Sequence, residues 1–122
     1  MLKTFMSNVY SEQMDNHFIK SIVAQKIKYV YFKESGEFLK FIEEEPEFKT
    51  KEFGAYICGL IELLCNKGNF EIPNWVLSDK YFLEKPYSSL HGYLRVSENL
   101  IKVTSEFFSK RNYFTNEDGV YV

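Results

Sequence analysis

The sequence contains little cysteine, histidine, proline or tryptophan, and each scarcity narrows the chemistry open to the protein. Its 122 residues include two cysteines, two histidines, three prolines and one tryptophan. Neither His17 nor His91 has a Cys, His, Asp or Glu partner at a zinc-ligand spacing, so we expect no metal site. Cys58 and Cys65 lie roughly 10 Å apart along a predicted helix, too far for a disulfide, and are expected in the core.

The sequence also lacks an apolar run of about 18 residues and a secretory leader, so we expect a cytoplasmic protein without a membrane span. It has no glycine-rich phosphate loop and no G-x-S-x-G, H-E-x-x-H or EF-hand pattern. Carboxylates are frequent, as in "EEEPE" at 43–47. Nothing there sets the pKa values of two carboxyl groups apart, as acid–base catalysis requires. The sequence therefore predicts a non-enzymatic protein without a cofactor.

The charge balance shows no excess of basic residues. The net charge is −2, whereas proteins that bind nucleic acid through a basic face usually carry excess Lys and Arg. Residues 35–90 are acidic, and residues 1–34 are mildly basic, with Lys20, Lys26 and Lys28 expected on the exposed face of a helix. The acidic part either meets a basic surface of a partner protein or is a solvated helix face.

The sequence contains enough apolar residues to form a hydrophobic core, since 45% of its residues are hydrophobic and 18% are aromatic. We expect one mainly α-helical domain over residues 1–122, a small bundle of about four helices, with 1–13 as a flexible N-terminal arm. A first helix is predicted after a cap at Asp15 or Asn16, because apolar residues follow at helical spacing. Residues 27–32 fit a helix or a short strand, and the lack of a preceding turn signal favours the helix.

A second and a third helix follow in the predicted order. Ser35 begins the second, which Glu45 closes before Pro46, and its acidic end opposes the helix dipole, so its last turn should fray. The third helix runs from a cap at Thr50 to a stop at Gly68, with one apolar face. It also carries a second strip, made of the small residues Ala55, Cys58 and Gly59. Small residues predict that another backbone packs closely against this strip.

The C-terminal part is predicted to hold a fourth helix over 89–102 and a short helical turn beginning near Ser105. A turn at 116–119 and a short terminal strand or hairpin are expected after it.

Residues 69–88 form a connector without a helical period. Pro73 and Pro86 favour extended backbone before them. We therefore expect the segment to be ordered only because its bulky side chains pack on the helices. Trp75 is expected to be buried, with its indole N–H bonded to a carbonyl group. The alternative is a partly exposed tryptophan that anchors a partner. The expected structural anchors are Trp75, Pro73, Pro86, Phe108 and Phe114.

Arg111 lies among aromatic residues, and two interpretations of it stay open. It either reaches a carboxylate of a partner protein or is a structural arginine paired with Asp79 or Glu84. The expected partner-binding residues are therefore Glu43, Glu44, Glu45, Glu47 and Arg111.

The order of motifs in residues 53–114 resembles that of small, mostly uncharacterised bacterial proteins. The sequence has "EIPNW", then "SDKYFLEKP", then "SEFFSKRNYF", where those proteins have a Pro-x-Trp, an Asp-x-x-Tyr-x-Leu-x-x-Pro run and a closing Phe-x-x-Arg-Asn-x-Phe. The matching residues are Pro73, Trp75, Asp79, Phe82, Leu83, Pro86, Phe108, Arg111, Asn112 and Phe114. Members of the group look like partners in toxin–antitoxin or phage-defence loci, and the resemblance implies no activity.

The residues and this resemblance together predict a non-enzymatic protein-binding component of a bacterial or prophage toxin–antitoxin or defence locus, either an antitoxin or an accessory factor. The expected partner is a protein, such as a toxin or a nuclease, and the oligomeric state stays open, a homodimer included. One alternative is a phage-encoded inhibitor of a nucleic-acid-guided nuclease, of the anti-CRISPR type. Another is a DNA-binding regulator that uses the lysines of the first helix.

Overall fold

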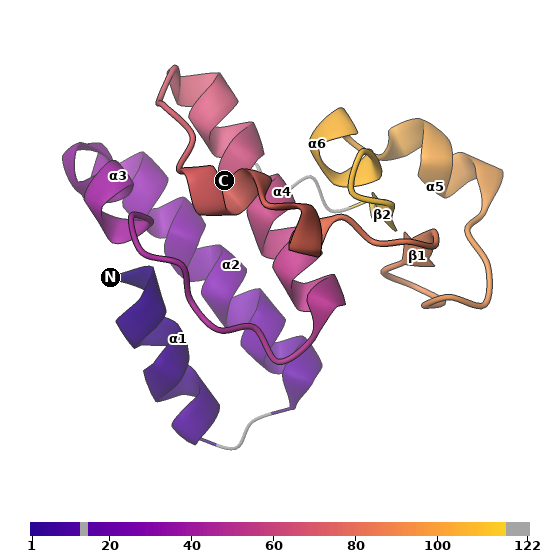
Figure 1. Cartoon of the computed structure of the whole chain (residues 1–122), viewed down its shortest axis with the longest axis horizontal. Helices are drawn as coiled ribbons and strands as arrows, with labels where there is room; N and C mark the ends of the chain where they lie inside the picture. The colour runs from indigo at the N-terminus through magenta and orange to yellow at the C-terminus, as the bar shows by residue number, and fades with distance from the viewer. Residues whose placement is uncertain (13–14, 117–122) are drawn as a thin grey trace. The chain divides into compact units, whose positions relative to one another are not determined.

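The computed structural model describes residues 1–12 and 15–116, and their secondary structure is mainly α-helical (Figure 1). The mainly α-helical class predicted from the sequence is confirmed. The chain divides by its internal contacts into two compact units, Met1–Lys49 and Thr50–Val122. The expectation of a single domain over 1–122 therefore stays a prediction.

The described part of the first unit is built on α-helices and one 3-10 turn. They are α1 (Leu2–Ser11), α2 (Asn16–Lys33), the 3-10 turn η1 (Ser35–Glu37) and α3 (Phe38–Phe41). α2 begins where the sequence predicts, because the Asp15 side chain accepts a hydrogen bond of 2.8 Å from the His17 backbone N–H. Residues 27–32 are helical, as favoured. The buried face of α2 carries Ile19, Val23, Ala24, Ile27 and Val30.

The prediction of a flexible arm over 1–13 is wrong for its described part, because Leu2–Ser11 forms α1. Leu2, Met6 and Val9 follow the i, i+4, i+7 spacing of one helix face, and all three are buried. α1 packs on α2. The Tyr10 hydroxyl at its end accepts a hydrogen bond of 3.3 Å from the Lys49 backbone N–H, which fastens the helix to the last residue of the unit.

The acidic stretch after α3 is not helical. α3 ends at Phe41, so Glu43, Glu44 and Glu45 lie beyond it rather than in a last turn. This agrees with the expected fraying, since carboxylates at a helix C-terminus oppose its dipole.

The second unit is built on α4 (Lys51–Gly68). The Thr50 side chain accepts a hydrogen bond of 3.1 Å from the Phe53 backbone N–H, as predicted for the cap. The helix includes Gly68 and ends at Asn69, whose φ of 57° is left-handed. The predicted stop at Gly68 is therefore wrong by one residue, because asparagine also tolerates this conformation. The other elements are η2 (Asn74–Leu77), η3 (Asp79–Tyr81), β1 (Tyr87–Ser88), α5 (Glu98–Val103), α6 (Glu106–Ser109) and β2 (Tyr113–Phe114).

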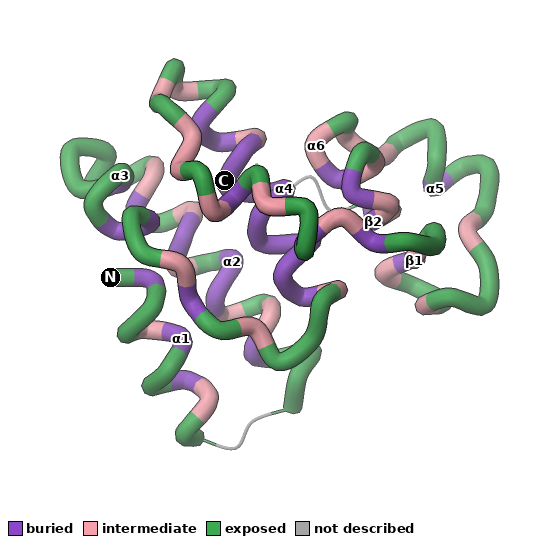
Figure 2. The backbone as a smooth tube through the Cα atoms, in the orientation of Figure 1, coloured by how far each residue is buried: buried purple, intermediate pink, exposed green. Residues whose placement is uncertain are grey.

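α4 is buried along most of its length (Figure 2). Within its unit it contacts η2, η3, α6 and β2. The closest approach is at Gly59, where the absence of a side chain admits the ring of Phe108 and the carbonyl group of Phe107. The small-residue strip therefore does what its composition predicts, since it lets the backbone of α6 come close.

Gly59→Ala is expected to lower the free energy of unfolding by about 1–3 kcal/mol. A Cβ atom at position 59 would stand 2.5 Å from Phe108 Cδ1 and 3.1 Å from the Phe107 carbonyl oxygen, and this crowding outweighs the gain of about 1 kcal/mol in helix propensity. Gly36→Ala is the control, because nothing lies within 4 Å of a Cβ there. Urea denaturation measures both, and equal effects of the two substitutions would contradict the packing of α6 on Gly59.

The connector lies along α4 through its two 3-10 turns. Val76, Tyr81 and Leu83 are its buried side chains. Trp75 is only half-buried, with its ring edge-on to Tyr81 at 6.4 Å between centroids. The prediction of a fully buried Trp75 is therefore wrong, because the smaller Val76 at the next position takes the buried place.

The predicted helix over 89–102 begins later, at Glu98. The Ser97 hydroxyl accepts a hydrogen bond of 3.2 Å from the Leu100 backbone N–H and so starts α5 there. Before it the chain turns back on itself, because Ser88 and Gly92 exchange both backbone hydrogen bonds at 2.8 Å. Gly92 has a φ of 61°, which glycine adopts readily.

The C-terminal part of the unit closes on the connector. α6 begins at the Ser105 cap, near where the sequence places a new helical turn. The expected short strand is present as β2, which pairs in parallel with β1 in the register Tyr87 to Tyr113. The predicted turn at 116–119 falls largely outside the described residues.

Candidate protein-binding surface

α2 has a second face besides its buried one, and that face is aromatic and exposed. The exposed fractions of Phe18, Tyr29 and Phe32 are 56%, 53% and 36%. With 3.6 residues per turn these three fall on one stripe together with the half-buried Ile22 and the exposed Gln25. We call the stripe formed by Phe18, Ile22, Gln25, Tyr29 and Phe32 the α2 outer face.

The sides of the α2 outer face are basic. Lys28 and His17 fall on one side of the stripe, and Lys26 and Lys33 fall on the other. The Lys26 Nζ lies 5.5 Å from the ring centroid of Tyr29 and 5.9 Å from that of Phe5, so its charge rests on aromatic faces. The side chains along both sides thus frame an apolar ridge with positive charge.

This arrangement corrects the prediction that lysines form the exposed face of the helix. Lys20, Lys26 and Lys28 point to different sides of α2, and the face opposite the buried one is aromatic instead. The sequence contains the signal, because positions 18, 22, 25, 29 and 32 follow a 4-3-4-3 spacing beside the buried series. Only the buried series was expected, since one apolar stripe suffices to fold a surface helix.

The predicted acidic residues lie at the surface of the same unit. Glu43, Glu44 and Glu47 are exposed and Glu45 is half-buried, whereas Pro46 between them is buried. They are spread along an irregular segment and do not form one face of a helix. Their role in binding a partner stays a prediction.

Arg111, by contrast, has no exposed side-chain surface. Its guanidinium donates to the carbonyl oxygens of Phe107 at 2.8 Å and Val76 at 2.9 Å, and it lies 4.9 Å from the ring centroid of Phe82. Its Nη1 forms an ion pair of 2.8 Å with Glu62 Oε1. The interpretation as a structural arginine therefore holds, whereas the expected contact with a partner is wrong for a side chain that is 0% exposed.

The carboxylate that Arg111 meets is Glu62 of α4, not Asp79 or Glu84 of the connector. Glu62 is 6% exposed, and its second oxygen forms an ion pair with Lys110. The angle of the Arg111 contact is not that of a hydrogen bond, and Arg111 Nε has no hydrogen-bond acceptor in the described part of the chain. The sequence signal for Glu62 is its position as the single charged residue between Phe53 and Cys65.

The other expected anchors differ in burial. Phe108 is fully buried, and its ring stacks on Tyr56 with 5.7 Å between centroids. Pro73 and Phe114 are half-buried, whereas Pro86 is exposed. Of the anchors, Phe108 therefore holds the unit together most directly.

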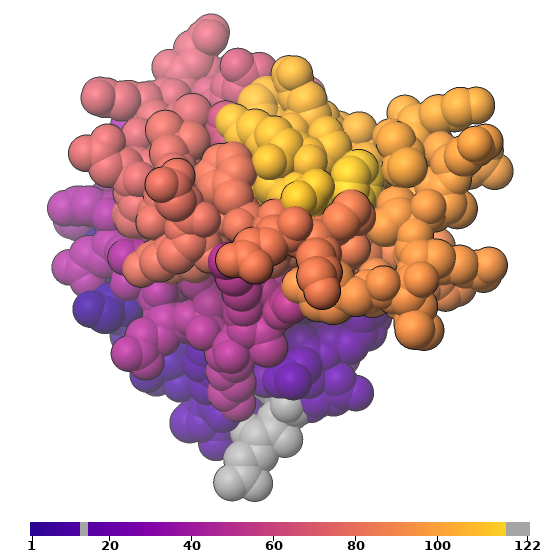
Figure 3. Space-filling view, turned by 45° about the vertical axis from the view of Figure 1, so that its right-hand side comes forward, coloured from indigo at the N-terminus to yellow at the C-terminus, as the bar shows by residue number. Residues whose placement is uncertain are grey.

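A second exposed apolar region lies in residues 89–103. Leu94 is 92% exposed, and Leu90, Ile101 and Val103 are each at least 50% exposed. Figure 3 shows this segment, in orange, at the surface of the molecule. Its apolar side chains lie on turns and on one short helix of six residues, so they do not share a single regular spacing.

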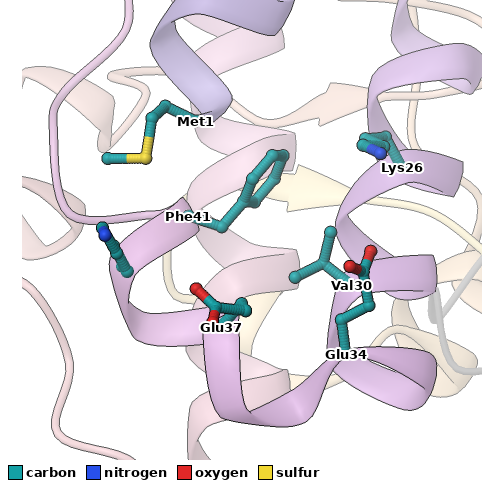
Figure 4. Close-up of a pocket in the computed structure, with 7 residues that line it drawn as sticks. Met1, Lys26, Val30, Glu34, Glu37 and Phe41 are labelled. Atoms are coloured by element: carbon teal, nitrogen blue, oxygen red, sulfur yellow. The ribbon is translucent and has the colours of Figure 1, made fainter.

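The first unit also contains an open cavity of about 500 Å³ (Figure 4). Val30, Phe41 and Met1 give it apolar walls, and Glu34 and Glu37 bring carboxylates to it. Lys26 and Lys40 complete the lining. Its charges are therefore mixed.

A cavity of about 440 Å³ lies in the second unit beside Tyr93 and is lined by Lys51, Leu83 and Lys85 among others. The Tyr93 hydroxyl donates a hydrogen bond of 2.5 Å to Glu52 Oε1. Partial burial, together with that carboxylate, raises the pKa of Tyr93 to about 12. The phenol therefore stays protonated at neutral pH and acts here as a hydrogen-bond donor.

The two cysteines lie on α4 and are buried, as predicted for core residues. Burial, with a smaller contribution from the charge of Glu62, raises the pKa of Cys65 to about 12. Among the described residues no three His, Cys, Asp or Glu side chains gather where they could hold a metal ion. Over the same residues no helix is both long enough and apolar enough to cross a membrane.

Comparison with protein-family models, with curated proteins and with solved structures gives no match to this chain.

Proposed function

We propose that the chain is a non-enzymatic protein-binding component and that the α2 outer face is the surface that holds its partner. The observation that carries this proposal is the alignment of three exposed aromatic side chains, Phe18, Tyr29 and Phe32, along one stripe of α2. Single exposed apolar residues are ordinary, but a contiguous apolar surface with a polar border is typical of protein interaction sites. Aromatic side chains also provide the strongest contacts in such interfaces.

The biological setting that we propose is a bacterial or prophage toxin–antitoxin or defence locus, with the chain as antitoxin or accessory factor. This part of the proposal rests on the resemblance carried by residues 53–114. The exposed Glu43, Glu44 and Glu47 favour one alternative, an inhibitor whose acidic segment covers the basic channel of a nucleic-acid-guided nuclease. A DNA-binding regulator has less support, because the lysines of α2 lie on separate sides of the helix.

The test is affinity purification of the tagged full-length chain from the cells that produce it. Phe18→Ser/Tyr29→Ser is expected to reduce the yield of a co-purified protein partner by at least about tenfold, as loss of two aromatic anchors does in other interfaces. Leu94→Ser is the control, since it removes an even more exposed apolar side chain from the other unit. A partner that is lost with Leu94→Ser and kept with the α2 variant would overturn the proposal.

A further inference from the structure

We infer that the α2 outer face receives an amphipathic α-helix of the partner protein, one whose apolar seam is flanked by acidic residues. This inference rests on the proposed function and specifies the partner's chemistry at the same surface. It follows from the spacing of the apolar ridge, from the charges beside it and from the polar residue at its centre.

The spacing fits a helix. Positions 18, 22, 25, 29 and 32 repeat at intervals of four and three residues, which is the a/d pattern of a seam between two helices. At 1.5 Å rise per residue the ridge from Phe18 to Phe32 is roughly 21 Å long, enough for three turns or more of a partner helix to lie along it. An extended strand presents side chains with a period of two residues and would match this ridge poorly.

The charges select an acidic partner. Lys28 lies on one side of the ridge and Lys33 on the other, in the places that the e and g positions take in paired helices. His17 and Lys26 add to the same two sides. Glu34 follows the last residue of α2, and its carboxylate lines the cavity of the first unit, as Lys26 does (Figure 4). A partner helix with Glu or Asp at its flanks would meet opposite charge along both edges.

The same charges argue against two other occupants. A second copy of this chain would bring its own Lys28 and Lys33 against those of the first, and like charges at these positions disfavour pairing. Single-stranded nucleic acid also binds to lysines interleaved with aromatic rings. The net charge of −2, however, gives the chain no general attraction for phosphate.

Gln25 adds a requirement of register. It is the one polar side chain among the five of the α2 outer face, and it lies at the centre. A single polar residue in an apolar seam fixes the register between helices, because sliding would bury it against apolar groups. The partner helix should therefore carry a polar residue opposite Gln25.

The test uses two designed peptides of three heptads with leucine at a and d and one central asparagine. One peptide carries glutamate at e and g, the other lysine, and the like charges on each keep it from pairing with itself. Binding to the full-length chain is followed by fluorescence anisotropy of the labelled peptide. The glutamate peptide is expected to bind at least about tenfold more tightly than the lysine peptide, and less tightly as the salt concentration rises.

Charge reversal gives the sharpest outcome. Lys28→Glu/Lys33→Glu is expected to invert the preference, so that the lysine peptide binds more tightly, whereas Leu94→Ser should leave both affinities unchanged. Circular dichroism checks that each variant keeps its helices. Equal binding of the two peptides, or displacement of the glutamate peptide by a single-stranded oligonucleotide, would overturn the inference. A dimer in sedimentation that Phe18→Ser/Tyr29→Ser dissociates would also overturn it, in favour of a second copy.

Failure of the inference is distinguishable from failure of the proposed function. If the glutamate peptide does not bind but an α2-dependent partner still co-purifies, the partner segment is not an acidic helix and the binding surface stands. If the partner is also insensitive to Phe18→Ser/Tyr29→Ser, the surface itself is wrong.

Discussion

Arg111→Ala is expected to lower the free energy of unfolding by about 3–5 kcal/mol, because it leaves the buried Glu62 carboxylate without its buried cationic partner. Glu62 is 6% exposed, so bulk water solvates its carboxylate poorly. The carbonyl groups of Val76 and Phe107 also lose their donor, which detaches η2 from α6. Lys110 keeps its ion pair with Glu62 and moderates the loss. Urea denaturation followed by the emission of Trp75, next to Val76, measures the change.

Two further variants separate the ion pair from general effects. Arg95→Ala removes an exposed arginine and should change the free energy of unfolding by less than about 0.5 kcal/mol. Glu62→Met/Arg111→Met removes both charges and should be more stable than Arg111→Ala, since no charge is then left buried alone. If Arg111→Ala is as mild as Arg95→Ala, the cluster does not hold the unit together.

Phe108→Ala is expected to cost about 3–5 kcal/mol, the range for truncating a buried phenylalanine. The Phe108 ring is fully buried, closes on the backbone of Gly59 and lies beside Tyr56 and Tyr113. Removing it opens a cavity that these large neighbours fill only in part. The same unfolding measurement applies to this variant.

The matched control is Phe18→Ala, whose side chain is 56% exposed. It should change the free energy of unfolding by less than about 0.5 kcal/mol. That result would also establish that substitutions on the α2 outer face test binding rather than folding. A Phe18→Ala variant as unstable as Phe108→Ala would contradict the assignment of this face as a free surface. In a Phe108→Ala background, Gly59→Ala should become nearly neutral, because the crowding ring is gone.

Those parts of the fold that local chemistry decides were predictable from the sequence. Asp15 and Thr50 cap α2 and α4 as expected, because each is a good acceptor directly before an apolar helical series. The predicted start of α5 at residue 89 is wrong, because Ser88 and Gly92 form a hydrogen-bonded turn there. That turn prevents the helix that the apolar spacing of Tyr93 and Val96 predicts. The sequence does not predict α1, because three apolar residues in so short a segment do not indicate a packed helix unless the helix that covers them is known.

The candidate surface could be predicted only in part, for a reason of tertiary structure. The sequence shows both apolar series of α2, but not which one the rest of the unit covers. In the same way Arg111 stands out by its aromatic neighbours, whereas its partner Glu62 lies 49 positions away along the chain and is brought there by the packing of α6 on α4. Acidic residues at 43–47 are conspicuous in the sequence because they are clustered and solvated, and their clustering does not by itself indicate a partner.

Site-specific photocrosslinking can establish whether the α2 outer face contacts a partner protein. A benzophenone amino acid is placed at position 29 in one variant and at position 94 in another, and each full-length chain is irradiated in the cells that produce it. If the α2 outer face holds the partner, position 29 gives a discrete protein crosslink that Phe18→Ser weakens, and position 94 gives none of the same mass. A crosslink from position 94 alone, or a crosslink from position 29 to nucleic acid, would contradict that assignment.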